Sequence, residues 1–142
     1  MMLGVRIGVA SKEKIKLKIR ASIDGEWTEQ EVVALYSTNG TIDVFIYEEN
    51  MEQFGEVRHF ITVQAGKVNI KRSGGVTMNQ QFLVGRKTES VYHHPYGNFH
   101  LEMDTKRINI EPGRVVLEYM SVINGTEKQE HHLEMMYVKE NK

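Results

Sequence analysis

The sequence of 142 residues predicts an all-β fold, a single antiparallel meander β-barrel of about eight to ten strands. The first observation behind this prediction is that apolar and polar residues alternate with a period of two through most of the chain. The clearest run, from Lys14 to Arg20, places three aliphatic side chains on one face and four cations on the other, which is typical of a half-buried strand. The second observation is that Gly, Asn, Asp or Pro interrupts the alternation at short intervals. Many such strands in series must hide their edges, and closure into a barrel does this most simply.

The strands are expected in eleven segments, some of which will merge: 13–23, 27–38, 41–49, 57–64, 67–72, 75–84, 88–94, 98–105, 107–111, 114–123 and 128–138. Asp-Gly and Asn-Gly pairs separate several of them and favour two-residue hairpin loops. The one helical turn expected lies around Asn50–Phe54. Gly74-Gly75 predicts a turn and not a phosphate loop, because no helix follows it.

The composition indicates one domain, residues 13–142, preceded by an N-terminal arm, residues 1–12. The absence of cysteine excludes disulfides, thiol catalysis and zinc–thiolate sites. Arg6 interrupts the short apolar run at the N-terminus, so we do not expect a signal peptide. No stretch is long enough to span a bilayer. We therefore expect a cytoplasmic protein with no membrane partner.

The charge is unevenly distributed: residues 1–25 hold six Lys and Arg, and residues 26–56 hold eight acids and no Lys or Arg. A basic stripe of this kind can indicate nucleic-acid binding. If Asp24-Gly25 is a two-residue loop, however, Arg20 pairs with Glu29 and Lys18 with Glu31 on the outer face. Because the cations then meet acids on the next strand, we expect no nucleic-acid partner.

The Asn39-Gly40 hairpin is expected to pair Ala34 with Phe45 and Val32 with Tyr47, which puts all four side chains on the inner face. The outer face of the same strands then carries a row of aliphatic side chains: Val33, Leu35, Ile42, Val44 and Ile46. Exposed apolar patches of this size usually have a partner. We expect the N-terminal arm to cover this row, on its own barrel or on that of a second copy in a homodimer.

The phase of the alternation changes once, between Phe99–Met103 and Ile108–Ile110. A bulge, bend or strand break near Asp104–Arg107 must absorb this change.

The chain resembles the YwiB-like bacterial proteins, a family of unknown function with a calycin-type, lipocalin-like β-barrel. The resemblance rests on Tyr47-Glu48-Glu49, on the strand with Met78 and Phe82, and on a Tyr-x-x-Pro-Tyr-Gly hairpin within Tyr92–Thr105. It covers roughly residues 13–139 and implies the fold and an intracellular setting. This chain departs from the family at His94, where threonine is usual, and in its N-terminal dozen residues. The resemblance implies no catalytic residues.

Six histidines raise the question of a metal site. Adjacent pairs, such as His131-His132, point to opposite faces of a strand and cannot bind one ion together. With Pro95–Asn98 as the loop, His93 would face His100, but a site needs three or four ligands. We expect packing or surface histidines, no metal and no cofactor.

The remaining candidates lie on the inner phase of the strands. Glu48 and Glu49 alternate faces and so cannot act on one bond as acid and base, although Glu49 could lie at the barrel mouth. Gln80 is in phase with inward residues and would need a partner inside the barrel. No nucleophile motif is present, and no catalytic residue is assigned.

Two classes of function remain. The first is a module that holds a small apolar or amphipathic ligand in the barrel. Its expected interior or mouth residues are Phe45, Tyr47, Glu49, Met78, Gln80, Phe82, Tyr92, Tyr96, Phe99 and Tyr119. The second is a structural or interaction protein with a filled barrel and an apolar outer face. An enzyme is the weakest alternative.

Overall fold

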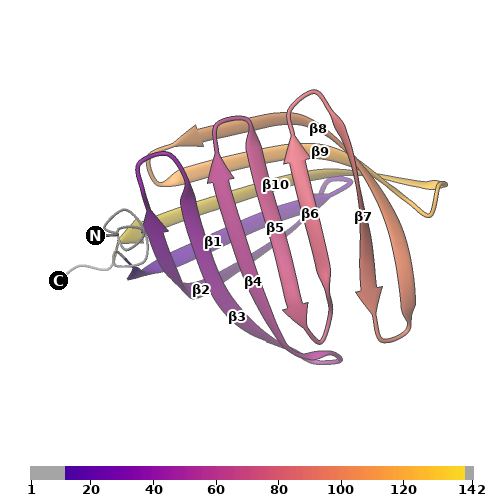
Figure 1. Cartoon of the computed structure of the whole chain (residues 1–142), viewed down its shortest axis with the longest axis horizontal. Coiled ribbons are helices and arrows are strands. Elements are labelled where there is room, and N and C mark those ends of the chain that lie inside the picture. The colour runs from indigo at the N-terminus through magenta and orange to yellow at the C-terminus, as the bar shows by residue number, and fades with distance from the viewer. Residues whose placement is uncertain (1–11, 140–142) are drawn as a thin grey trace, which may run out of the picture.

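The computed structural model describes residues 12–139, and in them ten antiparallel strands form one sheet that curls into a nearly closed barrel (Figure 1). The strands are β1 (Glu13–Ile23), β2 (Glu26–Thr38), β3 (Asp43–Met51), β4 (Gly55–Gln64), β5 (Lys67–Gly74), β6 (Met78–Leu83), β7 (Lys87–His94), β8 (Gly97–Glu111), β9 (Arg114–Ile123) and β10 (Glu127–Lys139). This confirms the predicted all-β meander. No helix within this part of the chain is long and apolar enough to cross a membrane.

The sheet order is β6-β5-β4-β3-β2-β1-β10-β9-β8-β7, so the first and last strands pair at its centre. Buried Glu134 on β10 accepts hydrogen bonds from Arg20 on β1, at 3.0 Å, and from Arg114 on β9. Burial acts to raise the pKa of Glu134, but the hydrogen bonds and charges of the two guanidinium groups outweigh it and lower this pKa. The three side chains therefore join three strands on the outer face.

The barrel closes incompletely where β6 faces β7. Thr77 and His93 exchange two backbone hydrogen bonds of 2.8 and 3.0 Å, and Val84 forms an isolated bridge with Thr105. The Thr88 hydroxyl also donates to the Gln81 carbonyl oxygen at 2.6 Å. No continuous ladder joins β6 and β7 in the described part of the chain.

The register of the first hairpin is as predicted. Asp24 and Gly25 form a two-residue loop with φ of 51° and 87°, and Arg20 pairs with Glu29. Lys18 likewise pairs with Glu31, although its ammonium lies nearer to Glu29, at 3.4 Å. Two cations of β1 therefore face two acids of β2 on the outer face.

The predicted register of the second hairpin is wrong by two residues. Tyr36, not Ala34, pairs with Phe45, because residues 39–42 form a four-residue loop. The Asn39 side-chain oxygen accepts hydrogen bonds from the amides of Thr41 and Ile42, at 2.9 and 2.8 Å, which stabilises the longer loop. Val32 is likewise not paired with Tyr47. A shift of two residues preserves the faces, so Phe45 and Tyr47 are buried inside as expected.

The predicted pairing of His93 with His100 is also wrong. Pro95 and Tyr96 form a two-residue loop, which places His93 opposite Asn98 and His100 opposite Val91. The Tyr96 amide donates to Nδ1 of His94 at 3.0 Å, and this contact holds the shorter turn.

The predicted change of phase along the eighth strand is confirmed. The segments 98–105 and 107–111 are one strand, β8, and a register shift between Thr105 and Arg107 absorbs the change of phase. The helical turn expected around Asn50–Phe54 is instead a hairpin turn, because β3 runs through Met51 and pairs with Gly55 at the start of β4, and the Phe54 amide donates to the Met51 carbonyl oxygen at 3.0 Å.

The outer aliphatic row lies partly as predicted. Val33 and Leu35 are 58% and 38% exposed, whereas Val44 and Ile46 are half-buried and Ile42 lies in the loop. The predicted arm, residues 1–12, lies outside the described residues except for Lys12. Its packing over the row therefore stays a prediction.

Candidate functional site

The interior of the barrel is filled at one end and open at the other. At the filled end Phe45 packs between Tyr36 and Tyr137, with ring centroids 5.2 and 5.1 Å away. At the open end lie two chambers with volumes of about 470 and 340 Å³. The two chambers share five lining residues: Ile23, Ile70, Arg72, Tyr92 and Leu133. The chambers are therefore neighbouring parts of one space. We call this space the lumen.

Strand alternation explains which side chains reach the lumen. Arg72 on β5 is paired with His59 on β4 and with Met78 on β6, and opposed residues of neighbouring strands share a face. The register continues from His59 to Tyr47 on β3. One row of inward side chains thus crosses four strands near the mouth.

A chain of hydrogen bonds runs along this row. Nε of Arg72 donates to Nδ1 of His59 at 3.2 Å, and Nε2 of His59 lies 3.0 Å from Oε1 of Glu49. Burial, and after it the charge of Arg72, lowers the pKa of His59, so the imidazole is neutral near pH 7. Because Nδ1 accepts, Nε2 carries the proton and donates to Glu49.

Aromatic rings fix both inward imidazoles. Tyr47 stacks on His59 with centroids 4.3 Å apart, and Tyr119 stacks on His131 at 4.4 Å. Burial raises the pKa of each tyrosine to about 12, against the opposing charge of Arg72. Both phenols therefore stay neutral and can donate or accept hydrogen bonds in the lumen.

The second chamber contains a hydroxyl–imidazole pair. Oγ of Ser121 lies 2.8 Å from Nε2 of His131, whose pKa is lowered by burial. A nucleophile of this kind usually needs a third group that orients the base. No carboxylate contacts His131 among the described residues. The pair contributes polar groups to the wall of the second chamber.

The ten residues expected to bind a ligand fall into three groups. Six line the chambers: Tyr47, Glu49, Met78, Gln80, Tyr92 and Tyr119. Phe45 and Phe82 are fully buried and fill the barrel. Phe99 is half-buried beside Tyr92, while Tyr96, 77% exposed, lies at the tip of the β7–β8 hairpin and does not line the lumen.

Sequence reasoning missed the three basic side chains of the lumen, Arg72, His59 and His131. The signal was available in the strand phase. His59 alternates in step with Val57 and Ile61, and Arg72 in step with Val68 and Ile70. A cation or imidazole on the apolar phase of a strand points into the barrel.

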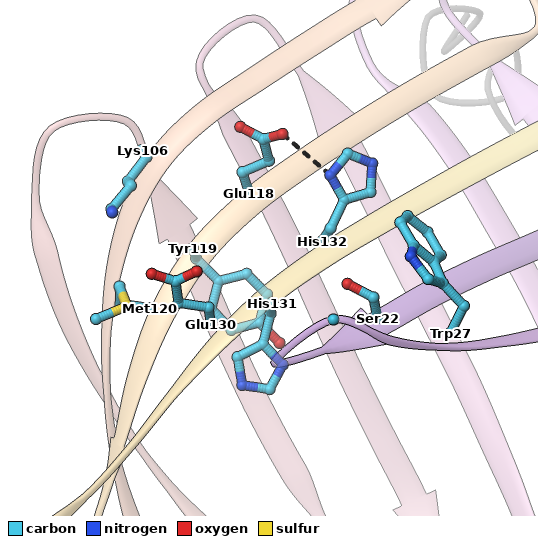
Figure 2. Close-up of a pocket in the computed structure, with 10 residues that line it drawn as sticks. Ser22, Trp27, Lys106, Glu118, Tyr119, Met120, Glu130, His131 and His132 are labelled. Carbon is cyan, nitrogen blue, oxygen red and sulfur yellow. Dashed lines mark hydrogen bonds and ion pairs between the residues drawn. The ribbon is translucent and has the colours of Figure 1, made fainter.

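A further pocket of about 390 Å³ lies beside β9 and β10, lined on the outer face by Glu118, His132 and Trp27 (Figure 2). Nδ1 of His132 is 3.0 Å from Oε2 of Glu118, and Trp27 packs edge-on against the imidazole at 5.2 Å. Figure 2 shows His131 and His132 projecting to opposite sides of β10, as their adjacency predicted. Ser22 is opposite His132 in the register, but no hydrogen bond joins them among the contacts of the described residues. In residues 12–139 no three acidic or histidine side chains are grouped to hold a metal ion.

The two lumen histidines predict a pH dependence of stability. Both folded-state pKa values lie below the ordinary value of 6.5, so below pH 6.5 the unfolded chain binds protons that the folded chain does not. The free energy of unfolding should therefore be highest above pH 6.5 and fall as the pH decreases towards the lowered values. Urea denaturation between pH 8 and pH 5 measures this dependence. A His59→Gln, His131→Gln double variant should show a flatter dependence, and an unchanged slope would contradict the assignment.

Comparison with known proteins places the chain among barrels of the same length. A family model described as "Domain of unknown function (DUF1934)" matches residues 14–135. The chain is 28% identical over 133 residues to the "Uncharacterized beta-barrel protein YwiB" of Bacillus subtilis (strain 168), which covers 87% of this chain and 92% of that protein. The crystal structure of the ywiB protein from Bacillus subtilis matches with a TM-score of 0.76 at 23% identity, over 92% of this chain and 94% of the other. This second likeness shows a shared fold.

Proposed function

We propose that this chain, which belongs to the DUF1934 family of YwiB-like β-barrel proteins, is a non-catalytic module that holds one small amphipathic molecule in its lumen. The observation that carries the proposal is the contrast between the two ends of the barrel. One end is closed by large buried side chains, and the other end is open.

The size and the lining of the lumen favour a small ligand. Binding sites for small molecules commonly measure roughly 300–1,000 Å³ and combine apolar walls with a few polar groups. Here the first chamber alone has about 470 Å³. Its apolar wall is formed by Ile19, Ile61, Ile70, Leu133 and Met135 among others.

The polar groups of the lumen are suited to binding more than to bond cleavage. The His59 imidazole has a hydrogen-bonding partner on each nitrogen and an aromatic ring against its face. A general base needs a free position towards its substrate. Fixed polar groups in an apolar space instead orient a ligand.

A second function, a protein-interaction module, is favoured by one observation. Leu35, Ile46 and Phe60 are paired in register across β2, β3 and β4 on the outer face, and Leu35 and Phe60 are each 38% exposed. An apolar row of this kind on a wet face suits contact with a second copy of the chain.

One measurement distinguishes the two functions. Native mass spectrometry of the full chain purified from its own host should show a monomer or dimer with one added small molecule per barrel, which leaves under denaturing conditions. A dimer with no added mass would favour the interaction module.

Isothermal titration with octanoate and octan-1-ol should in addition show binding of one molecule per chain. The absence of both an added mass and titratable binding would contradict the ligand-binding function.

A further inference from the structure

We propose that Arg72 is the anchor of the lumen, and that the ligand is a single-chain amphiphile with a carboxylate head held by this guanidinium group and an apolar tail along the walls. This inference rests on the proposed function and names the class of ligand. It follows from where Arg72 lies and from the partners that it has.

Arg72 lies at the junction of the two chambers. It faces inward from β5, is half-buried, and lines both spaces. Its charge acts on Tyr47 in the first chamber and on Tyr119 in the second. A ligand in either chamber is therefore within the field of the same cation.

The guanidinium group has unused donors. Nε donates to His59, but no carboxylate lies within 4.0 Å of Arg72 in the described part of the chain. Glu49 reaches it only through the intervening imidazole. An inward cation without a carboxylate partner is unfavourable, and the two terminal nitrogens of the guanidinium group match the two oxygens of a carboxylate.

Other arginines of the described chain are placed differently. Arg20 and Arg114 share Glu134, and Arg58 pairs with Glu48 on the outer face at 3.1 Å. Arg86 and Arg107 are exposed. Among the described arginines, Arg72 alone combines an inward position with the lack of a carboxylate partner.

The surroundings of Arg72 indicate a head with one charge and a tail without charge. The residues shared by the two chambers are otherwise apolar or aromatic: Ile23, Ile70, Tyr92 and Leu133. Glu49, already part of the hydrogen-bonded row, disfavours a second negative charge nearby. A medium-chain fatty acid has these properties.

The test uses octanoate and octan-1-ol, which share a tail and differ in the head. Isothermal titration of the full-length native chain and of the Arg72→Gln variant compares their affinities. The variant should bind octanoate about tenfold or more weakly than the native chain does. Octan-1-ol affinity should stay within about twofold, which also shows that the variant is folded. Arg72→Lys keeps the charge but loses the paired donors, so its octanoate affinity should lie between those of the native chain and Arg72→Gln. Arg58→Gln removes an arginine from the outer face and should bind octanoate as the native chain does.

The outcomes separate this inference from the function on which it rests. A selective loss of octanoate binding in Arg72→Gln supports the anchor. Unchanged octanoate binding, or an equal loss for both compounds, overturns the anchor while the lumen remains a binding site. Failure of the native chain to bind either compound overturns the proposed function itself.

Discussion

Replacement of Phe45 by alanine should lower the free energy of unfolding by about 3–5 kcal/mol, the range typical of a large aromatic side chain removed from a core. Phe45 is fully buried and lies between Tyr36 on β2 and Tyr137 on β10, the two strands that flank β1. Because three rigid rings meet there, the neighbours cannot collapse into the space left by the missing ring. Urea denaturation followed by circular dichroism measures the change.

Phe60→Ala is the matched control for this substitution. Phe60 lies on the outer face of β4 and is 38% exposed, so its removal leaves no enclosed cavity. It should destabilise the protein by much less than Phe45→Ala. Equal losses for the two variants would contradict the filled end of the barrel described above.

Gly75→Ala should destabilise the protein by roughly 3 kcal/mol, at the upper end of the range for overpacked sites. A Cβ atom at Gly75 would lie 1.7 Å from the Phe54 carbonyl oxygen and 2.6 Å from its carbonyl carbon. The Gly75 amide also donates to the Glu56 carbonyl oxygen at 3.0 Å. Since the obstacle is backbone, the β3–β4 turn and the β5–β6 link must move apart. The midpoint of urea denaturation reports the effect.

Gly25→Ala separates steric crowding from backbone strain. Gly25 has φ of +87° but nothing within 4 Å of an added Cβ atom, so the substitution should cost only about 1–2 kcal/mol for the left-handed conformation. If Gly75→Ala costs no more than Gly25→Ala, the close approach of Phe54 and Gly75 is not maintained in solution.

The fold could be predicted because alternation and turn residues act locally. Asp24-Gly25 satisfies the backbone of a two-residue loop, so counting from it gave the register of β1 and β2. Asn39-Gly40 has the same type of sequence, but the Asn39 side chain binds two amides of a longer loop. The choice between these loops depends on side-chain hydrogen bonds that a dipeptide pattern does not contain.

The candidate site was predictable only in part. Tyr47, Met78 and Gln80 were placed inside by their phase, and the register confirms it. Arg72 was missed because charged residues are usually exposed, and its partner His59 lies on another strand. Which end of the barrel is open depends on how side chains from many strands fill it, and this is a property of packing in three dimensions.

The central pairing of β1 with β10 has a consequence for synthesis on the ribosome. Arg20 and its partner Glu134 are 114 residues apart, a distance that translation covers on the order of ten seconds at about 5–20 residues per second. Until the last strand emerges, β1 has a neighbour on one edge only, β2, and its aliphatic side chains have no barrel to enter. Strands β2 to β5, in contrast, can pair with sequence neighbours on both edges as the chain leaves the exit tunnel. We therefore expect nascent chains stalled before residue 127 to remain open sheets that chaperones recognise through β1.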